Sequence, residues 1–424
     1  MNQNQHHEDL KKSRRNFIKQ GIVGLTGAVA LPTMLKGEPG LETAQDKPTT
    51  PAPKPDSKGK FVYRTLGNTG IKLPVVSMGV MNADNPELVK AALDAGFVYF
   101  DTAWVYQMGR NEEMLGQQLK GRPRDSYVIS TKVFEPRDRQ TGLFPPDAKV
   151  ENFVEKFQIS LKRLGLDYVD ILFLHNITRK ESVVFEPFLE ALKKFKKEGK
   201  TRFIGVSTHG NEPEVIRATV DSKAYDVVLT SYNFRQLYLA DMDAAIAYAA
   251  KAGLGVVAMK TMAGGYWDGK EKKFPINMKA ALKWALQNEN IHTAIPGFTT
   301  FDQMYLDQSV MEDLTLTPEE KEALKPPKDL KDLKSVGFYC QQCEKCLLQC
   351  PAKLEIPTLM RSYMYAYGYR NLGKAKQTLD SVDLSRMGCN DCSVCKVKCA
   401  IGIDIKDRVH DIIRLKDVPM DFIA

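Results

Sequence analysis

Residues 151–175 read ENFVEKFQISLKRLGLDYVDILFLH, an amphipathic helical pattern over Glu151–Leu164 followed by a short apolar run over Tyr168–His175. An apolar run of this length predicts a buried strand, and the periodic apolar residues before it predict a helix that packs on a core. The same alternation recurs along the chain. The strand-like runs are Val75–Val80, Val98–Ala103, Tyr127–Val133, Tyr168–His175, Arg202–Ser207, Val227–Ser231, Gly255–Met259 and Thr293–Pro296.

Eight such alternations in about 250 residues predict an α/β fold, a (β/α)8 TIM barrel. Helical patterns over Phe185–Lys197, Asp241–Lys251 and Met278–Glu289 fall between the strands, and Tyr63–Pro74 has the turn residues of a hairpin. A doubly wound sheet would require two of the strands to be spurious. It is disfavoured because no Gly-x-Gly-x-x-Gly motif follows the first strand.

The composition excludes several classes of protein. The chain has 424 residues and is 43% hydrophobic, as expected of a globular core. A mean hydropathy of −0.32 excludes a multi-pass membrane protein. The net charge of +8 is partly local, because residues 1–30 hold five basic and two acidic residues. No long basic run follows, so the charge does not indicate a nucleic-acid partner.

The N-terminus has the pattern of a targeting segment. Ser13-Arg14-Arg15-Asn16-Phe17-Ile18-Lys19 precedes the apolar stretch Gly21–Leu31, and Ala28-Val29-Ala30 offers a small-residue cleavage site. Residues 1–30 resemble a twin-arginine signal peptide, which implies export to the periplasm or another place outside the cytoplasm. The apolar stretch is too short to span a bilayer, so we expect no membrane span in the mature chain. A disordered basic tail and an uncleaved anchor are the alternatives.

Four chemically distinctive residues follow three consecutive predicted strands: Asp101 and Tyr106, then Lys132, then His175. Catalytic groups of such barrels lie at the C-terminal ends of the strands, so we expect these side chains to converge. They suit carbonyl reduction, in which Tyr106 donates a proton to the developing alkoxide. Lys132 would lower the tyrosine pKa, Asp101 would hold the lysine, and His175 would hydrogen-bond the substrate oxygen. Each residue alone also has a structural reading, as a helix cap, core aromatic, solvent-facing lysine or rim histidine.

Residues 61–325, which include these four residues, resemble the aldo-keto reductase superfamily. The matching segments are Tyr63-Arg64-Thr65-Leu66-Gly67, Asp101-Thr102-Ala103-Trp104-Val105-Tyr106, Gly109–Gly116, Ser130-Thr131-Lys132 and Leu174-His175. The resemblance implies that Tyr106 is the general acid/base, that Lys132 and Asp101 tune it, and that His175 polarises the carbonyl. It also implies that NADP or NAD binds across the top of the barrel.

The resemblance further implies a set of nucleotide-binding positions. They are Ser207, Thr208, Met259, Lys260, Gly264, Gly265, Pro296, Gly297 and Gln303. Three nicotinamide contacts depart from the family pattern, with Thr208 in place of Asn, Leu229 in place of Gln, and Met259 in place of a stacking aromatic residue. A basic residue that would bind the 2′-phosphate is missing from Phe298–Asp302, so NADP and NAD both stay open.

All eight cysteines lie between Cys340 and Cys399 in two runs of the same C-x2-C-x2-C-x3-C spacing. The first run ends in Pro351, and Ala400 replaces this proline in the second. This is the run of bacterial two-cluster ferredoxins, in which the fourth cysteine ligates the other cluster. We therefore expect two [4Fe-4S] clusters, one held by Cys340, Cys343, Cys346 and Cys399, the other by Cys350, Cys389, Cys392 and Cys395. Zinc and disulfides are disfavoured by the repeated fourth cysteine.

The predicted organisation is a signal peptide (1–30), a linker (31–60), a barrel (61–328) and a dicluster domain (329–424). Residues 351–388, with tyrosines at 363, 365, 367 and 369, read as a helical insert that packs on the barrel; an electron relay through the tyrosines is the alternative. The iron–sulfur domain takes the place of the tail that shapes the substrate pocket in the family, so it would cover the site or deliver electrons near it.

Two functions stay open. One is a nicotinamide-dependent oxidoreductase for a small carbonyl or alcohol substrate, with clusters for electron transfer or structure. The other is an electron-transfer or redox-sensing protein on a non-catalytic barrel. A redox partner protein would suit either function. Clusters move single electrons and nicotinamide moves a hydride, and no flavin motif is evident to convert between them.

Overall fold

The computed structural model describes residues 61–138, 141–263, 276–325, 340–384 and 395–423. These residues belong to one compact unit, Pro51–Ala424. The predicted signal peptide and linker lie outside the described residues, as do Gly264, Gly265, Cys389 and Cys392.

Eight parallel strands form one sheet in sequence order, and the sheet closes into a nearly complete barrel. The first and last strands meet through the parallel bridge Val76–Ala294, and Ser77 N donates to Ala294 O at 2.8 Å. The strands are β3 (Met78–Gly79), β4 (Tyr99–Asp101), β5 (Val128–Val133), β6 (Val169–Ile177), β7 (Thr201–Thr208), β8 (Val227–Ser231), β9 (Gly255–Met259) and β10 (Thr293–Ala294). The predicted (β/α)8 barrel is confirmed. The first and last strands are shorter than predicted because only part of each extended run pairs regularly with its neighbours.

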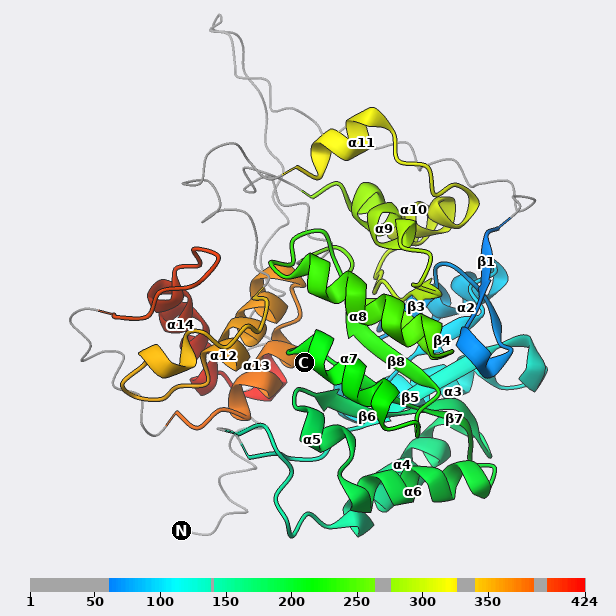
Figure 1. The fold of residues 1–424 in the computed structure, drawn as a ribbon, viewed down its shortest axis with the longest axis horizontal. Helices are drawn as coiled ribbons and strands as arrows, with labels where there is room; N and C mark the ends of the chain where they lie inside the picture. The colour runs from blue at the N-terminus through cyan, green and yellow to red at the C-terminus, as the bar shows by residue number, and fades with distance from the viewer. Residues whose placement is uncertain (1–60, 139–140, 264–275, 326–339, 385–394, 424) are drawn as a thin grey trace, which may run out of the picture. The chain divides into compact units, whose positions relative to one another are not determined.

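A helix follows each strand, and the helices lie outside the strands (Figure 1). They are α2 (Pro86–Asp94), α3 (Arg110–Leu119), α4 (Val150–Leu164), α6 (Glu186–Lys197), α7 (Glu212–Asp221), α8 (Leu239–Lys251), α9 (Met278–Gln287) and α10 (Phe301–Glu312), with the shorter α5 (Lys180–Val183) and α11 (Pro318–Ala323) besides. This arrangement buries both faces of each strand, which explains why the strands read as continuous apolar runs.

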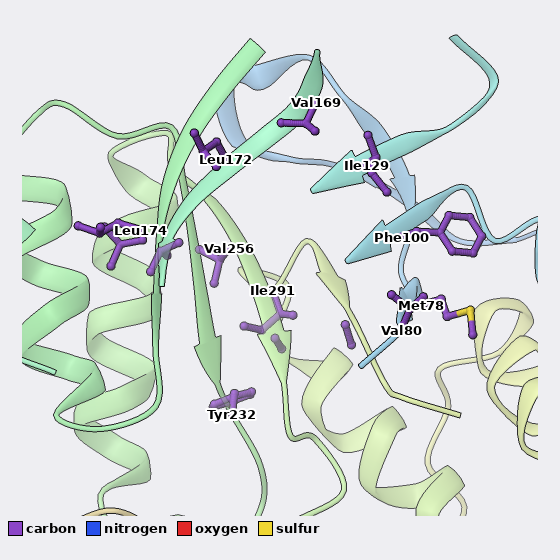
Figure 2. Packing of buried hydrophobic residues seen from close by; sticks show 14 of the residues in the cluster. Met78, Val80, Phe100, Ile129, Val169, Leu172, Leu174, Tyr232, Val256 and Ile291 are labelled. Atoms are coloured by element: carbon purple, nitrogen blue, oxygen red, sulfur yellow. The ribbon is translucent and has the colours of Figure 1, made fainter. Parts of the chain in front are cut away.

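The two faces of each strand pack into different cores because side chains alternate along a strand. On β6, Ile171 and Phe173 point into the barrel interior, whereas Leu172 and Leu174 pack between strands and helices. Figure 2 shows residues of this outer layer, among them Leu172 and Leu174 of β6, Ile129 of β5 and Val256 of β9.

The predicted hairpin is also confirmed. β1 (Tyr63–Thr65) pairs antiparallel with β2 (Lys72–Pro74). Its residues Leu66 and Leu73 belong to the same cluster as the interior side chains of the barrel. The turn passes close to the chain that precedes β9. A Cβ at Gly67, whose φ is +49°, would lie 2.4 Å from Gly253 O, so this position requires glycine.

The C-terminal residues form helices around a core of their own. The helices are α12 (Ile356–Tyr363), α13 (Leu372–Asp380) and α14 (Ile405–Ile413), with a π-helical turn, η6, over Met364–Gly368. Leu359, Leu379, Val409 and Cys346 share this core. The expected helical insert is therefore present. In the described part of the chain, none of the helices has the length and apolarity required to cross a bilayer.

Candidate functional site

Three strands bring three polar side chains to the same end of the barrel interior. Asp101, Lys132 and His175 share the interior register of their strands with Tyr99, Ser130 and Phe173, and all three are buried. Tyr106 begins the short helical turn η2 (Tyr106–Gly109) just beyond β4. The structure therefore brings all four predicted catalytic residues together.

Lys132 is the centre of this group. Its Nζ lies 2.5 Å from Asp101 Oδ2, 2.7 Å from Thr102 O and 3.4 Å from Tyr106 Oη. Ser130 Oγ donates to the other carboxylate oxygen of Asp101 at 2.6 Å. The carboxylate thus has hydrogen bonds at both oxygens and holds the ammonium group next to the phenol.

The backbone after Tyr106 adopts an unusual conformation that fixes the position of this ring. Gln107 and Met108 have φ values of +50° and +56°, in the left-handed region. The Gln107 amide donates to Met81 O and Ala83 O at 3.2 and 3.1 Å, which ties the turn to the loop after β3. Such strain persists only where the surroundings determine it, and it is typical of functional sites.

Electrostatics at the site correct one expectation. Burial raises the pKa of Tyr106 well above its ordinary value, with further contributions from the negative charge of Asp101 and from Tyr365. The net shift is therefore opposite in direction to the fall expected from Lys132, because burial dominates it. Burial also lowers the pKa of Lys132 and raises the pKa of Asp101. The opposite charge of the partner reduces both shifts. The positive charge of Lys132 is directed mainly at Asp101, and Tyr106 stays protonated.

His175 is held neutral. Burial lowers its pKa well below the ordinary value, and nearby cations, Lys132 first, act in the same direction. Its ring lies edge-on to Tyr106 and to Phe134, with centroids 6.2 and 6.3 Å away. A neutral imidazole carries one N–H donor, and Nδ1 has no hydrogen-bond partner in the described structure. The ring is therefore free to bind an oxygen atom in the adjoining cavity.

These shifts predict how activity depends on pH. Tyr106 is protonated at every pH below its raised pKa, so a step that takes its proton should keep a constant kcat between about pH 6 and pH 9. The reverse step needs the phenolate, so its kcat should rise with pH over the same range. Steady-state rates in both directions at saturating substrate measure this. A forward kcat that falls between about pH 7 and pH 8 would mean that the pKa of Tyr106 is lowered and not raised.

A cavity of about 320 Å³ opens next to the four residues. Asp101, Tyr106 and His175 line it. Of the expected nucleotide-binding residues, Met259, Lys260, Pro296 and Gly297 also line it. A side chain at Gly297 would meet Gly79 O at 3.3 Å, so glycine keeps this wall open.

Three other expected nucleotide-binding residues, Ser207, Thr208 and Gln303, do not line the cavity. The Ser207 hydroxyl accepts from Asn176 N at 2.9 Å, Thr208 Oγ1 donates to Gly210 O at 3.0 Å, and Gln303 Oε1 accepts from Thr299 N at 2.8 Å. Leu229 packs in the barrel interior. Gly264 and Gly265 lie outside the described residues.

Sequence reasoning missed several lining residues. His209, directly after β7, is a half-buried residue of the cavity wall, and its buried Nδ1 has no partner among the described residues. Its position just beyond a strand end was the signal that could have identified it. Arg361, Tyr365, Tyr369 and Lys374 come from the C-terminal insert and also line the cavity. The expectation that this domain covers the site is confirmed for these residues.

The C-terminal domain is fastened to the barrel by polar contacts on two sides of the cavity. Asn371 Nδ2 donates to Asn82 Oδ1 at 3.0 Å. Gln341 accepts from Leu237 N at 2.9 Å and donates to Arg235 O at 2.5 Å, and Arg179 forms an ion pair with Glu344 at 2.7 Å. Gln341 follows Cys340 directly, so the first cysteine run is anchored on the barrel.

Four cysteines line one small cavity in the C-terminal domain: Cys340, Cys343, Cys346 and Cys399. This is the set expected around one cluster. The neighbouring side chains are largely apolar, and burial raises the thiol pKa of Cys340 to about 11. Among the described residues, the acidic, histidine and cysteine side chains form no group close enough for a single metal ion. A cubane differs because each thiolate binds a different iron. For the other set, only Cys350 and Cys395 are described.

The fold and site define a (β/α)8 barrel with a buried polar site, joined to a cysteine-rich domain. Comparison with known proteins identifies the family of the barrel. The Aldo/keto reductase family model matches residues 77–279, and the 4Fe-4S dicluster domain model matches residues 339–404. "Uncharacterized oxidoreductase YrpG" of Bacillus subtilis is 30% identical over 240 residues, 52% of this chain and 72% of that protein. The chain belongs to the aldo-keto reductase family.

Other relatives are consistent with this assignment. "L-galactose dehydrogenase" of Arabidopsis thaliana is 28% identical over 307 residues, 62% of this chain and 92% of that protein. The solved structure of an aldo-keto reductase, AKR11C1 of Bacillus halodurans, has the same fold with a TM-score of 0.52 at 23% identity, covering 62% of this chain and 95% of that one. The chain is thus an oxidoreductase of this family that carries a 4Fe-4S dicluster domain.

Proposed function

We propose that the protein interconverts a carbonyl and an alcohol with NADP or NAD as hydride carrier. The observation that carries this proposal is the hydrogen-bonded group of Asp101, Lys132 and Tyr106, which lies with His175 at the wall of one cavity. The substrate is a small carbonyl or alcohol compound.

The cavity suits a nicotinamide nucleotide in two respects. The Lys260 side chain has no hydrogen bond or ion pair among the described residues, so its ammonium group is available for a phosphate. Asn176 Oδ1 and His209 Nδ1 are buried without a partner in the described structure, and both residues line the cavity. Buried polar atoms of this kind normally have a partner, and a bound molecule would supply one. When bound, the nucleotide supplies or accepts the hydride.

The four polar residues have separate tasks in carbonyl reduction. Tyr106, protonated at neutral pH, donates its hydroxyl proton to the developing alkoxide. His175 donates a hydrogen bond that orients the same oxygen. Lys132 stabilises the phenolate left behind, and Asp101 keeps Lys132 charged and in place.

The direct test follows absorbance of reduced nicotinamide when the protein is mixed with small aldehydes and ketones without oxygen. The proposal predicts nucleotide oxidation that depends on the carbonyl. An electron-transfer or redox-sensing protein on a non-catalytic barrel would oxidise no nucleotide in response to the carbonyl. The replacement of the usual nicotinamide contacts at Thr208, Leu229 and Met259 is the feature that favours this second function.

We also propose that the two cysteine runs hold two [4Fe-4S] clusters, for electron transfer or structure. The four cysteines around one cavity support the assignment of Cys340, Cys343, Cys346 and Cys399 to one cluster, with Cys350, Cys389, Cys392 and Cys395 on the other. The role is tested by removing iron. Full carbonyl reductase activity in iron-free protein would make the clusters structural. Activity that requires them would support electron transfer, to a redox partner protein or to the barrel.

Replacing one ligand should remove one cluster. Cys340→Ala is expected to reduce iron from about eight to about four atoms per chain, because one cubane loses a ligand and the other keeps its set. Iron analysis of anaerobically purified protein measures this. The matched control is Leu348→Ala, a fully exposed residue of the same run that does not line the cavity around Cys340. Unchanged iron in Cys340→Ala would contradict the ligand role.

The twin-arginine pattern at Arg14-Arg15 supports a further proposal, export of the folded protein to the periplasm. This route suits a protein whose clusters and nucleotide are inserted before transport. Fractionation of cells that produce Arg14→Lys/Arg15→Lys should find the protein retained in the cytoplasm. Normal export of this variant would contradict the proposal.

A further inference from the structure

The wall of the active-site cavity carries an excess of positive charge. Lys260, Arg361 and Lys374 line it, and Asp101 is the one acidic residue among the described lining residues. Asp101 is already bound by Lys132. In the described structure, the side chains of Lys260 and Arg361 make no hydrogen bond or ion pair, and Lys374 Nζ binds only the neutral Gln377 Oε1, at 2.9 Å.

Cations without counterions are costly inside a protein, because they lose water and repel one another. The pKa of both Lys260 and Lys374 is lowered to about 8, first by burial and then by the charge of Arg361. An arrangement of this kind is stable when a ligand brings negative charge.

Lys374 lies beside the proton donor. Its Nζ is 5.9 Å from the centroid of the Tyr106 ring, and Lys132 Nζ is 4.9 Å from the same centroid. Lys374 is fixed there by its helix. Asn371 caps α13 by accepting from Lys374 N at 2.8 Å, and the same side chain is hydrogen-bonded to Asn82 of the barrel. The barrel thus supplies Tyr106, and the iron–sulfur domain supplies a cation next to it.

We propose that Arg361 and Lys374 bind a carboxylate or phosphate group of the substrate, which is therefore an anionic carbonyl compound. The proposal rests on the proposed carbonyl chemistry at Tyr106. We assign the anion held by Lys374 to the molecule that Tyr106 protonates, because Lys374 Nζ lies 5.9 Å from the centre of the Tyr106 ring. Their closeness also means that the anionic group is a short distance from the carbonyl, as in a short oxo acid or the phosphate ester of a hydroxy ketone.

The test measures inhibition by two anions, oxalate and inorganic phosphate, of the reduction of a neutral aldehyde at constant ionic strength. We expect at least one to compete with the aldehyde and not with the nucleotide. The inhibition constant should rise tenfold or more in Lys374→Met and in Arg361→Met, because each variant loses a charge-assisted hydrogen bond. Lys374→Arg keeps the charge and should retain inhibition. The stronger anion identifies the carboxylate or phosphate class.

The control is Lys416→Met, an exposed lysine of the same domain that does not line the cavity. Competition with the nucleotide, or equal inhibition of Lys374→Met and the wild type, would overturn the proposal. If the wild type reduces no aldehyde, the proposed function has failed. Anion binding is then measured as the rise in melting temperature that oxalate or phosphate produces. A smaller rise in Lys374→Met and Arg361→Met than in the wild type would support the anion site without the carbonyl chemistry.

Discussion

Tyr106→Phe should lower kcat for carbonyl reduction by about 10²- to 10⁴-fold while leaving nucleotide binding nearly unchanged. The substitution removes one oxygen atom from a buried ring whose hydroxyl lies 3.4 Å from Lys132 Nζ. It leaves the ion pair between Lys132 and Asp101 intact. The fall in kcat therefore measures the loss of proton donation and not a collapse of the site.

The matched control is Tyr367→Phe. This tyrosine lies on the same C-terminal insert as the cavity-lining Tyr365, but it is 40% exposed and stacks on Tyr363 instead of lining the cavity. Its kcat should equal that of the wild type. Single-turnover mixing of the nucleotide-loaded protein with an aldehyde measures the chemical step in each variant. Equal rates in Tyr106→Phe and the wild type would remove Tyr106 from the chemistry.

Lys132→Met should be the most destabilising substitution in the site, at about 3–5 kcal/mol. It leaves the buried Asp101 carboxylate with Ser130 as its remaining side-chain partner. Asp101 would then either keep its charge without a cation beside it or take up a proton, and both outcomes lower the free energy of unfolding. In a barrel of this size the loss corresponds to a fall of roughly 10 °C in melting temperature.

A double-mutant cycle separates the lost pair from lost packing. Asp101→Asn/Lys132→Met removes both charges, so it should be more stable than Lys132→Met alone. The control is Lys193→Met, which breaks a solvent-exposed pair with Glu190 and should cost less than about 1 kcal/mol. Additive effects of the two single substitutions at Asp101 and Lys132 would show that the pair does not couple.

The barrel and the four polar residues were predictable from the sequence because both depend on local pattern. Alternation along each strand decides which side chains enter the interior, and Asp101, Lys132 and His175 each end an apolar run on the interior face. The cysteine spacing likewise indicated which thiols meet, since Cys399 joins the first run at one cavity.

The rest depended on contacts between distant parts of the chain. Arg361 and Lys374 reach the active site because the C-terminal domain docks on the barrel, and no local pattern marks them. Burial raises the pKa of Tyr106 where the sequence suggested a fall, with smaller contributions from Asp101 and from Tyr365 of the C-terminal domain. Ser207 and Gln303 matched a family pattern but make hydrogen bonds within the protein.

The central claim is that a hydride passes to a carbonyl carbon in the cavity beside Tyr106. The most direct measurement uses reduced nicotinamide nucleotide that carries deuterium at the transferring position, with mass spectrometry of the alcohol product after a single turnover. We predict one deuterium on the former carbonyl carbon in the wild type and a greatly slowed appearance of the same product in Tyr106→Phe. A product without deuterium, or nucleotide oxidation that reduces the clusters and forms no alcohol, would contradict the claim.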